Sequence, residues 1–220
     1  MKTECSPIQN TACFDVRLLS CYYDEECIFN NLNFSLAQGE LLVITGPNGS
    51  GKTTLLKALA GLAPYEGLVE WQGYSILENR PEYNNNVDYL GHLSPLKLHL
   101  SVIENILLAT SLTTTHSSCF VQSQMRSLLI ALGLAKITLT QPVKALSAGQ
   151  KRRLALLILV LNQKSLWLLD EPLTALDHLG KESFAQLLNQ HLNRGGMAVA
   201  TTHHQIEEFN VVNYQMLSLG

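Results

Sequence analysis

The hydrophobic positions of this chain change period along its length, and the changes predict strands that alternate with helices. Short apolar runs typical of buried strands occupy Leu42–Thr45, Val87–Leu90, Leu166–Leu169 and Met197–Thr201, with a candidate last strand at Val212–Leu219. Apolar residues at helical spacing occupy Lys52–Ala60, Ser147–Leu161 and Lys181–Leu192. Strands that alternate with helices pair in parallel, so the pattern predicts an α/β fold around a parallel sheet.

Two regions interrupt this alternation. Near the N-terminus, Phe14–Cys21 and Ile28–Ser35 alternate with a period of two, which predicts a small antiparallel sheet. In the middle of the chain, Val102–Ala109 and Val121–Leu132 have helical spacing and predict an inserted helical lobe over about residues 92–146. The length of 220 residues favours a single domain that contains both regions.

A polar segment separates the two kinds of structure. Leu68–Gln72 is predicted to be a short strand that ends at Gly73. Glu78–Asn86 follows it, and its Pro81 and three asparagines predict a surface loop.

The turn between the first strand and helix of the predicted sheet has a composition that suits phosphate groups. Residues 46–53 follow the pattern Gly-x-x-x-x-Gly-Lys-Thr, in which glycines let backbone N–H groups turn inward toward an anion. Lys52 supplies a point charge for the outer phosphates, and Thr53 offers a hydroxyl to Mg²⁺. A glycine turn without a ligand is the alternative, which the flanking strand and helix disfavour. The residues expected to contact the nucleotide are Gly46, Pro47, Asn48, Gly49, Ser50, Gly51, Lys52, Thr53 and Thr54.

Two carboxylates follow the buried strand Leu166–Leu169. The carboxyl ends of parallel strands line the ligand crevice of an α/β sheet, so Asp170 is expected near the glycine loop, as a ligand of Mg²⁺ through water. Glu171 is expected to polarise an attacking water. A solvated acidic turn is the alternative, and the complete glycine loop makes it the weaker one.

A third motif begins the long helix Ser147–Leu161. Ser147 and Gln150 form a capping-box pattern, while Ala148 and Gly149 leave the first backbone amides approachable. These features are compatible with a second anion site, although a well-capped helix without a ligand is the preferred interpretation of the motif in isolation. The basic run 151–153 is interpreted as a solvated face of the helix.

Together, the glycine loop, LSAGQ about a hundred residues later and LLDEP some twenty residues further resemble the ATP-binding cassette family over nearly the whole chain. The resemblance implies a P-loop ATPase with ATP and Mg²⁺ as cofactors. It also implies a homodimer of two head-to-tail cassettes, in which Ser147, Ala148, Gly149 and Gln150 of one chain face the γ-phosphate held by the other. Such a two-fold arrangement is self-complementary and closed.

The same resemblance places four further residues. Tyr23 lies at the spacing of the aromatic residue that stacks on adenine, with Tyr22 as a competing candidate. Asp177 resembles the loop aspartate that crosses the dimer interface. His203 resembles the switch histidine that contacts the γ-phosphate, with His204 beside it. His92 stands where the family usually has a metal-sensing glutamine, so it is a candidate Mg²⁺ contact that also titrates.

The composition of the chain limits the classes of partner that it is expected to bind. With 15 basic and 18 acidic residues the net charge is −3, which argues against nucleic-acid binding. The five cysteines form no metal-ligand pattern and are expected to be free thiols. The apolar run Leu154–Leu161 is too short for a membrane span, so a membrane role requires a partner.

Within the cassette family, the segments LSAGQKRRLAL, DEPLTALD and ATTHH resemble the ATP-binding subunits of bacterial haem exporters used in cytochrome c maturation. This implies an integral membrane permease as partner and a peripheral position on the cytoplasmic face of the inner membrane. Two alternatives remain open at this stage: a transporter ATPase for another cargo, and a nucleotide-gated cassette protein without transport.

Overall fold

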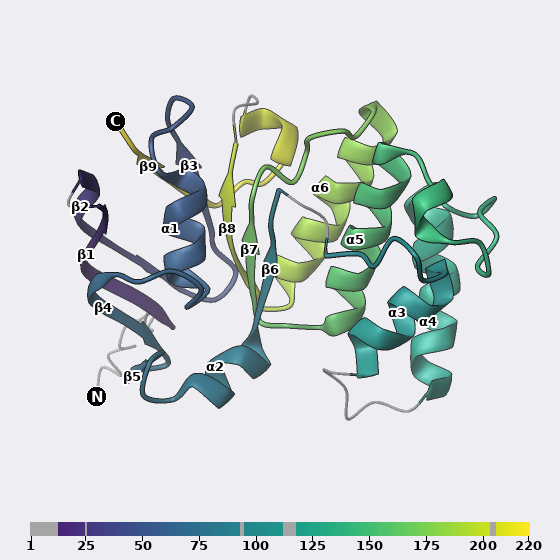
Figure 1. The fold of residues 1–220 in the computed structure, drawn as a ribbon, viewed down its shortest axis with the longest axis horizontal. Coiled ribbons are helices and arrows are strands. Elements are labelled where there is room, and N and C mark those ends of the chain that lie inside the picture. Colours follow the sequence, from purple (N-terminus) through teal and green to yellow (C-terminus); the bar gives the residue numbers. More distant parts are fainter. Residues whose placement is uncertain (1–12, 25, 93–94, 112–117, 203–205) are drawn as a thin grey trace, which may run out of the picture.

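The computed structural model describes residues 13–24, 26–92, 95–111, 118–202 and 206–220, and two sheets organise them. The central sheet has five strands in the order β6 (Val87–Leu90), β7 (Leu166–Leu169), β8 (Met197–Thr201), β3 (Leu41–Thr45) and β9 (Tyr214–Ser218). Neighbouring strands of this sheet pair in parallel throughout, as the alternation of strands and helices predicted (Figure 1).

Both faces of the central sheet are buried, which explains why its inner strands are continuously apolar. Alternate residues of each strand point to opposite faces, so Leu41 and Val43 of β3 pack in one hydrophobic core while Leu42 and Ile44 pack in the other. In β7, Trp167 likewise packs in the first core, whereas its neighbour Leu168 packs in the second.

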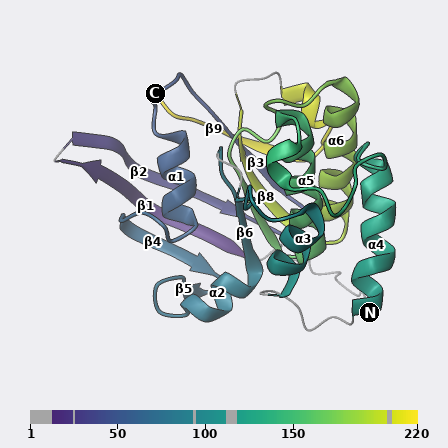
Figure 2. The same cartoon turned by 45° about the vertical axis from the view of Figure 1, so that its right-hand side comes forward.

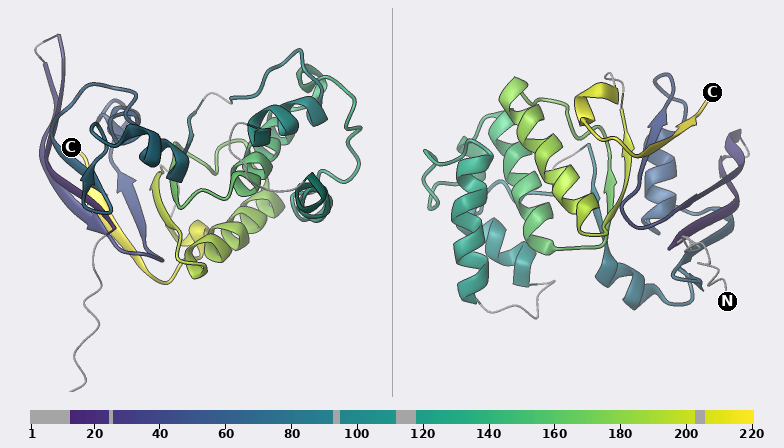
Figure 3. Two further views of the ribbon diagram at one scale, coloured as in Figure 1. Left: turned by 90° about the horizontal axis from the view of Figure 1, so that it is seen from below. Right: turned by 180° about the vertical axis from the view of Figure 1, so that it is seen from behind.

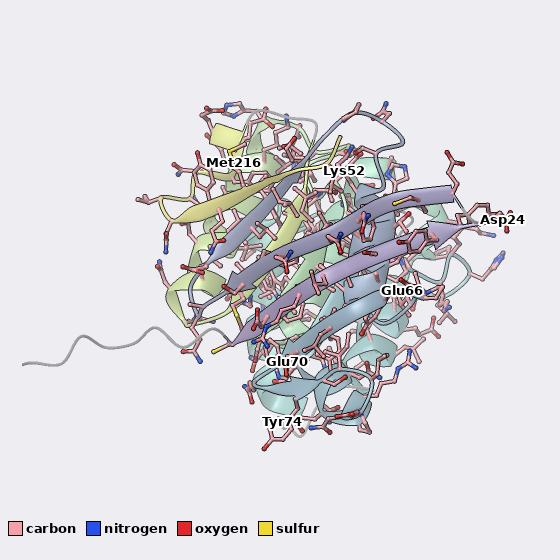
Figure 4. The ribbon with its side chains drawn as sticks, turned by 90° about the vertical axis from the view of Figure 1, so that its left-hand side faces the viewer. Asp24, Lys52, Glu66, Glu70, Tyr74 and Met216 are labelled. Carbon is pink, nitrogen blue, oxygen red and sulfur yellow. The ribbon has the colours of Figure 1, made fainter. Side chains whose placement is uncertain are left out.

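The second core lies between the central sheet and an antiparallel sheet. This sheet has the order β2 (Glu26–Leu36), β1 (Phe14–Tyr23), β4 (Glu66–Trp71) and β5 (Tyr74–Ser75). The helix α1 (Lys52–Leu59) runs between the two sheets (Figure 1). Figure 4 views the antiparallel sheet from its outer side, where Asp24 marks the tip of the β1–β2 hairpin and Glu66 and Glu70 mark β4.

The first core lies under helices on the opposite face of the central sheet. The helices α5 (Ala148–Asn162) and α6 (His178–Asn193) cover that face, and α3 (Val102–Ser111) and α4 (Ser118–Ala131) pack beyond them against α5 (Figures 1 and 2). Two short 3₁₀ helices, η1 (Val143–Ala145) and η2 (Ile206–Phe209), complete the described elements. Figure 3 shows α3 and α4 at the end of the molecule away from the antiparallel sheet.

One prediction about secondary structure was wrong. The segment expected to be a surface loop contains the helix α2 (Arg80–Asn86), in which Pro81 sits in the first turn, where its missing N–H costs nothing. Tyr83 anchors this helix, because its ring is fully buried beside Phe14 and Trp71 and its hydroxyl donates to the Leu59 carbonyl at 2.7 Å. Tertiary packing therefore overrides the polar composition of the segment.

None of the helices in the described part of the chain is long and apolar enough to cross a bilayer.

Candidate nucleotide-binding site

The glycine loop joins β3 to α1 at the carboxyl edge of the central sheet and forms one wall of a cavity of about 540 Å³. Gly46 and Gly51 have φ angles of +149° and +89°. A Cβ atom at Gly46 would lie 2.2 Å from the Leu219 carbonyl oxygen, and one at Gly51 would lie 2.5 Å from Ile28 Cγ2. Both positions therefore require glycine for sterics as well as for backbone conformation. The loop residues that line the cavity are Asn48, Gly49, Gly51, Lys52, Thr53 and Thr54.

Lys52 lies beneath the loop. Its side chain is buried, and Nζ donates hydrogen bonds of 2.8 Å to the carbonyl oxygens of Gly46 and Pro47. The Ser50 amide donates to the Pro47 carbonyl at 3.3 Å, so Pro47 and Ser50 shape the turn. The ammonium group is thus held at the cavity wall, where it faces any anion that the loop amides bind.

Asp170 directly follows β7 and lies beside the glycine loop. Its carboxylate is only 2% exposed, and it accepts two hydrogen bonds of 2.9 Å, from Thr53 Oγ1 and from Thr201 Oγ1. The pair of oxygens from Thr53 and Asp170 fits a hard divalent cation such as Mg²⁺. Within the described ranges no group of three or more His, Cys, Asp or Glu side chains is placed to bind a metal.

Glu171 follows Asp170 and lines the same cavity. Its φ angle is +47°, in a region that residues with a Cβ rarely adopt. The Glu171 amide donates to Thr201 Oγ1 at 2.9 Å, and Oε2 accepts a hydrogen bond of 3.3 Å from Thr174. The carboxylate thus faces the same space as Lys52 and Thr53, as the strand-end argument predicted.

The helix α5 begins elsewhere on the surface. Ser147 Oγ accepts from the Gln150 amide at 3.2 Å, and the Gln150 side chain accepts from the Ser147 amide at 2.9 Å, so the predicted capping box is present. Ser147 and Ala148 are exposed, and neither they nor Gly149 and Gln150 line the cavity of the glycine loop. One chain therefore carries the two predicted phosphate sites apart from each other.

His92 is also separate from the carboxylates. Its side chain is exposed and lines a different cavity of about 320 Å³, between the start of α5 and the loop that holds Thr174. Within one chain, the structure does not bring His92 to the oxygen pair of Thr53 and Asp170.

The remaining sequence-predicted residues have distinct surroundings. Tyr23 is 70% exposed and lines the cavity of the glycine loop together with the free thiol of Cys27, whereas Tyr22 does not line it. Asp177 caps α6 by accepting from the Gly180 amide at 2.8 Å, and it forms an ion pair with Arg153. These two contacts lower the pKa of the Asp177 carboxyl. His203 and its neighbour His204 lie outside the described residues.

Sequence reasoning missed the role of Arg152, which it placed on a solvated basic face. The side chain is buried, and its guanidinium donates to the carbonyl oxygens of Gly91, Asp170, Glu171 and Pro172 at 2.8 to 3.2 Å. Burial lowers the pKa of Arg152, while the nearby carboxylates of Asp170 and Glu171 oppose that shift. A signal was present, because Arg152 lies four residues before Leu156 and so shares its buried face.

Comparison with known proteins agrees with this site. A family model described as ABC transporter matches residues 29–174. The chain is 43% identical over 197 residues to the cytochrome c biogenesis ATP-binding export protein CcmA of Nitrosococcus oceani, covering 89% of this chain and 87% of the relative. It is 40% identical to the protein of the same name from Nitrosomonas europaea, with 94% of each chain covered.

Solved structures show the same fold. A structure titled as the ATP-binding subunit of an ABC transporter superposes with a TM-score of 0.83 at 23% identity, covering 93% of this chain and 85% of that chain. A putative ABC transporter ATP-binding protein from Pyrococcus furiosus gives a TM-score of 0.77 at 21% identity, covering 93% and 96%. The expected fold class is confirmed: an ABC-type P-loop ATPase with an antiparallel β subdomain and an inserted helical subdomain. The chain belongs to the ABC transporter family and, within it, to the group of the CcmA ATP-binding proteins.

Proposed function

We propose that this chain binds Mg²⁺-ATP in the cavity of the glycine loop and hydrolyses it with Glu171 as the general base. The observation that carries the proposal is that Lys52, Thr53 and Glu171 line one cavity, while the buried Asp170 accepts a hydrogen bond from Thr53 beside it. Lys52 neutralises charge on the outer phosphates, and the Glu171 carboxylate accepts a proton from the attacking water. Tyr23, on the opposite wall, stacks on the adenine ring.

The oxygen pair described above would hold the metal ion. The Thr53 hydroxyl, and the Asp170 carboxylate through water, would hold Mg²⁺, which would supply positive charge next to the phosphates. The hydrogen bond from Thr201 fixes Asp170 Oδ1, so that Oδ2 stays directed toward Thr53. His92 would approach the metal only through a rearrangement of the loop that follows β6.

We further propose that two copies of the chain form the complete catalytic unit. The support is the exposed, capped start of α5, which presents Ser147, Ala148 and Gly149 away from the chain's own cavity. A helix N-terminus attracts anions, so Ser147 of one copy would contact the γ-phosphate bound by its twin. In this arrangement Asp177 and His203 lie at the interface and at the γ-phosphate, respectively.

For the biological role, we propose haem handling in cytochrome c maturation, with ATP turnover coupled to an integral membrane permease. The relatives are named for cytochrome c biogenesis and export, and the chain matches them over most of its length. The helical lobe, over about residues 92–146 of one continuous ATPase domain, would transmit closure of the dimer to the permease. The chain would then lie peripherally on the cytoplasmic face of the inner membrane.

A Glu171→Gln variant tests the catalytic proposal. The amide keeps the shape of the side chain but cannot accept the proton, so we expect ATP affinity within about threefold of the parent and hydrolysis slower by roughly 10²–10⁴-fold. ATP should also trap the variant as a dimer in size-exclusion chromatography, because the γ-phosphate that joins the copies persists. Hydrolysis at the parental rate would show that Glu171 is not the base.

A further inference from the structure

Side chains from two distant segments hold the backbone of Glu171. Its amide donates to Thr201 Oγ1, and its carbonyl oxygen accepts from Arg152 Nη2, each at 2.9 Å. Thr201 is the last residue of β8, and Arg152 lies in the second turn of α5. The Glu171 carbonyl oxygen also accepts from the Thr174 amide at 3.1 Å, within the local turn. Both hydrogen-bonding groups of Glu171 therefore have a side-chain partner that is far away in the sequence.

The conformation that these contacts hold is an unfavourable one. A φ angle of +47° at a glutamate persists only where the surroundings determine it, because a residue with a Cβ prefers negative φ. The direction in which the Glu171 carboxylate leaves the backbone depends on this angle. The two long-range contacts oppose relaxation of this peptide toward negative φ, in addition to the local bonds that Thr174 makes to the carbonyl and carboxylate of Glu171.

Arg152 also connects this peptide to the start of α5. Its planar fork reaches four backbone carbonyls, from Gly91 after β6 and from residues 170–172 after β7. Arginine suits this task because it presents several donors in a fixed plane, which neither lysine nor glutamine offers. Ser147 lies five residues before Arg152 on the same rigid helix, so a shift of the helix start is transmitted to the Glu171 peptide.

We propose that Arg152 and Thr201 are positioning residues for Glu171 and that they form a clamp on its peptide. The clamp makes the exposed start of α5 and the Glu171 carboxylate move as one unit. This inference depends on the proposed role of Glu171 as general base, and it adds two residues that touch neither nucleotide nor metal in the arrangement described above.

Substitution of Thr201 separates positioning from packing. Thr201→Val keeps the volume but removes the hydroxyl, and we expect kcat to fall about 10- to 100-fold while the affinity for ATP stays within about threefold. Thr201→Ser keeps the hydroxyl and should retain kcat within about threefold, since the bonds to Glu171 and Asp170 can still form. If serine is the damaging substitution and valine the tolerated one, the residue serves packing only and the clamp is refuted.

A double-mutant cycle isolates the action on Glu171. Arg152→Gln should lower the single-turnover rate about 10-fold or more in the parent, but less than about threefold in the Glu171→Gln background, where there is no carboxylate to position. Arg152→Lys should resemble Arg152→Gln, because charge without the planar fork does not reach the four carbonyls. Arg80→Gln is the matched control, since Arg80 also donates to a backbone carbonyl, that of Gly61, at the far end of α1.

The outcomes distinguish the two proposals. A full-rate Glu171→Gln enzyme refutes the general base. If Glu171→Gln is slow as expected and Arg152→Gln lowers its residual rate as much as it lowers the rate of the parent, the clamp is refuted and the general base is retained. Binding of a fluorescent ATP analogue to each preparation shows that the variants are folded, because the residues that bind the phosphates are unchanged.

Discussion

The carboxyl and amino edges of the central sheet, where its strands end and begin, contain different kinds of side chain. At the carboxyl edge, Asp170, Thr201 and Arg152 are buried polar side chains that bond to one another's segments around the cavity of the glycine loop. At the amino edge, Trp167 stacks on His191 with ring centroids 3.8 Å apart and an angle of 4° between the planes. The carboxyl edge thus keeps polar atoms in fixed positions, whereas at the amino edge an aromatic pair packs beside a cavity of about 560 Å³.

This difference indicates that the carboxyl edge serves the site and the amino edge serves stability. Buried polar networks set the geometry of a site, and they add less to stability than packed apolar surface of the same size. Variants at the carboxyl edge should therefore change nucleotide binding and turnover with little loss of stability. Variants at the amino edge should change stability and leave turnover of the folded protein intact. The predictions below test this separation.

Lys52→Ala gives the largest expected effect at the carboxyl edge. We expect ATP affinity to fall by roughly 100-fold or more, because the ammonium's charge-assisted contact with the phosphates is lost. The free energy of unfolding without nucleotide should change by less than about 1 kcal/mol, since only two bonds to loop carbonyls disappear. Isothermal titration calorimetry and chemical denaturation measure the two quantities.

Lys57→Ala is the matched control for this experiment. Lys57 lies on the same helix but is exposed in its last turn, so its removal should alter neither quantity appreciably. An unchanged ATP affinity for Lys52→Ala would contradict the assignment of the glycine loop.

The same contrast explains what the sequence could and could not predict. The carboxyl edge was largely predictable, because Lys52 and Thr53 are adjacent in one motif and Asp170 and Glu171 end one apolar strand. The proposed clamp could not be predicted from the sequence, because Arg152, Glu171 and Thr201 come from three segments that meet only in the folded chain. A basic triplet is typical of a surface, and only the position of Arg152, four residues before the buried Leu156, hinted that its side chain is buried.

The amino edge was less predictable still. Stacking of His191 on Trp167 joins a helix end to a strand, and no local pattern reports it. The helix α2 was missed for the same reason, because its one anchor, Tyr83, is recognisable only once the buried ring and its partners are known. Sequence motifs predict where the site residues lie when those residues are adjacent in the chain. Packing between distant segments has no comparable local pattern.

His191 gives the second prediction, at the amino edge. Burial lowers its pKa to about 4, below the value of 6.5 that it has in an unfolded chain. Between pH 6.5 and about pH 4, the unfolded state therefore binds a proton at His191 and the folded state does not. The free energy of unfolding consequently falls as the pH falls through this range. From pH 7 to pH 5, this group should cost about 2 kcal/mol of stability, measured by urea denaturation.

His191→Phe supplies the comparison. Phenylalanine keeps a ring against Trp167 but does not titrate, so the variant should lose about 2 kcal/mol less than the parent between pH 7 and pH 5. Other titrating groups, such as the buried Asp88, are common to both proteins and cancel in the difference. The ATPase rate of His191→Phe at pH 7 should match that of the parent. A large fall in kcat would contradict the idea that the two edges of the sheet have separate roles.

Ser147 gives a smaller expected change in stability than His191, and it sharpens the comparison because one side chain both caps a helix and is proposed to contact a phosphate. Ser147→Ala removes the helix cap and should cost about 1 kcal/mol, whereas Ser147→Asp keeps an acceptor for the Gln150 amide and should cost less. If the proposed dimer forms, both should slow ATP turnover, since alanine removes the hydroxyl proposed to contact the partner's γ-phosphate and aspartate adds like charge at that place. Chemical denaturation and steady-state ATPase assays separate the effects: an aspartate variant that is stable and fully active would mean that α5 is only capped, and that no phosphate meets it.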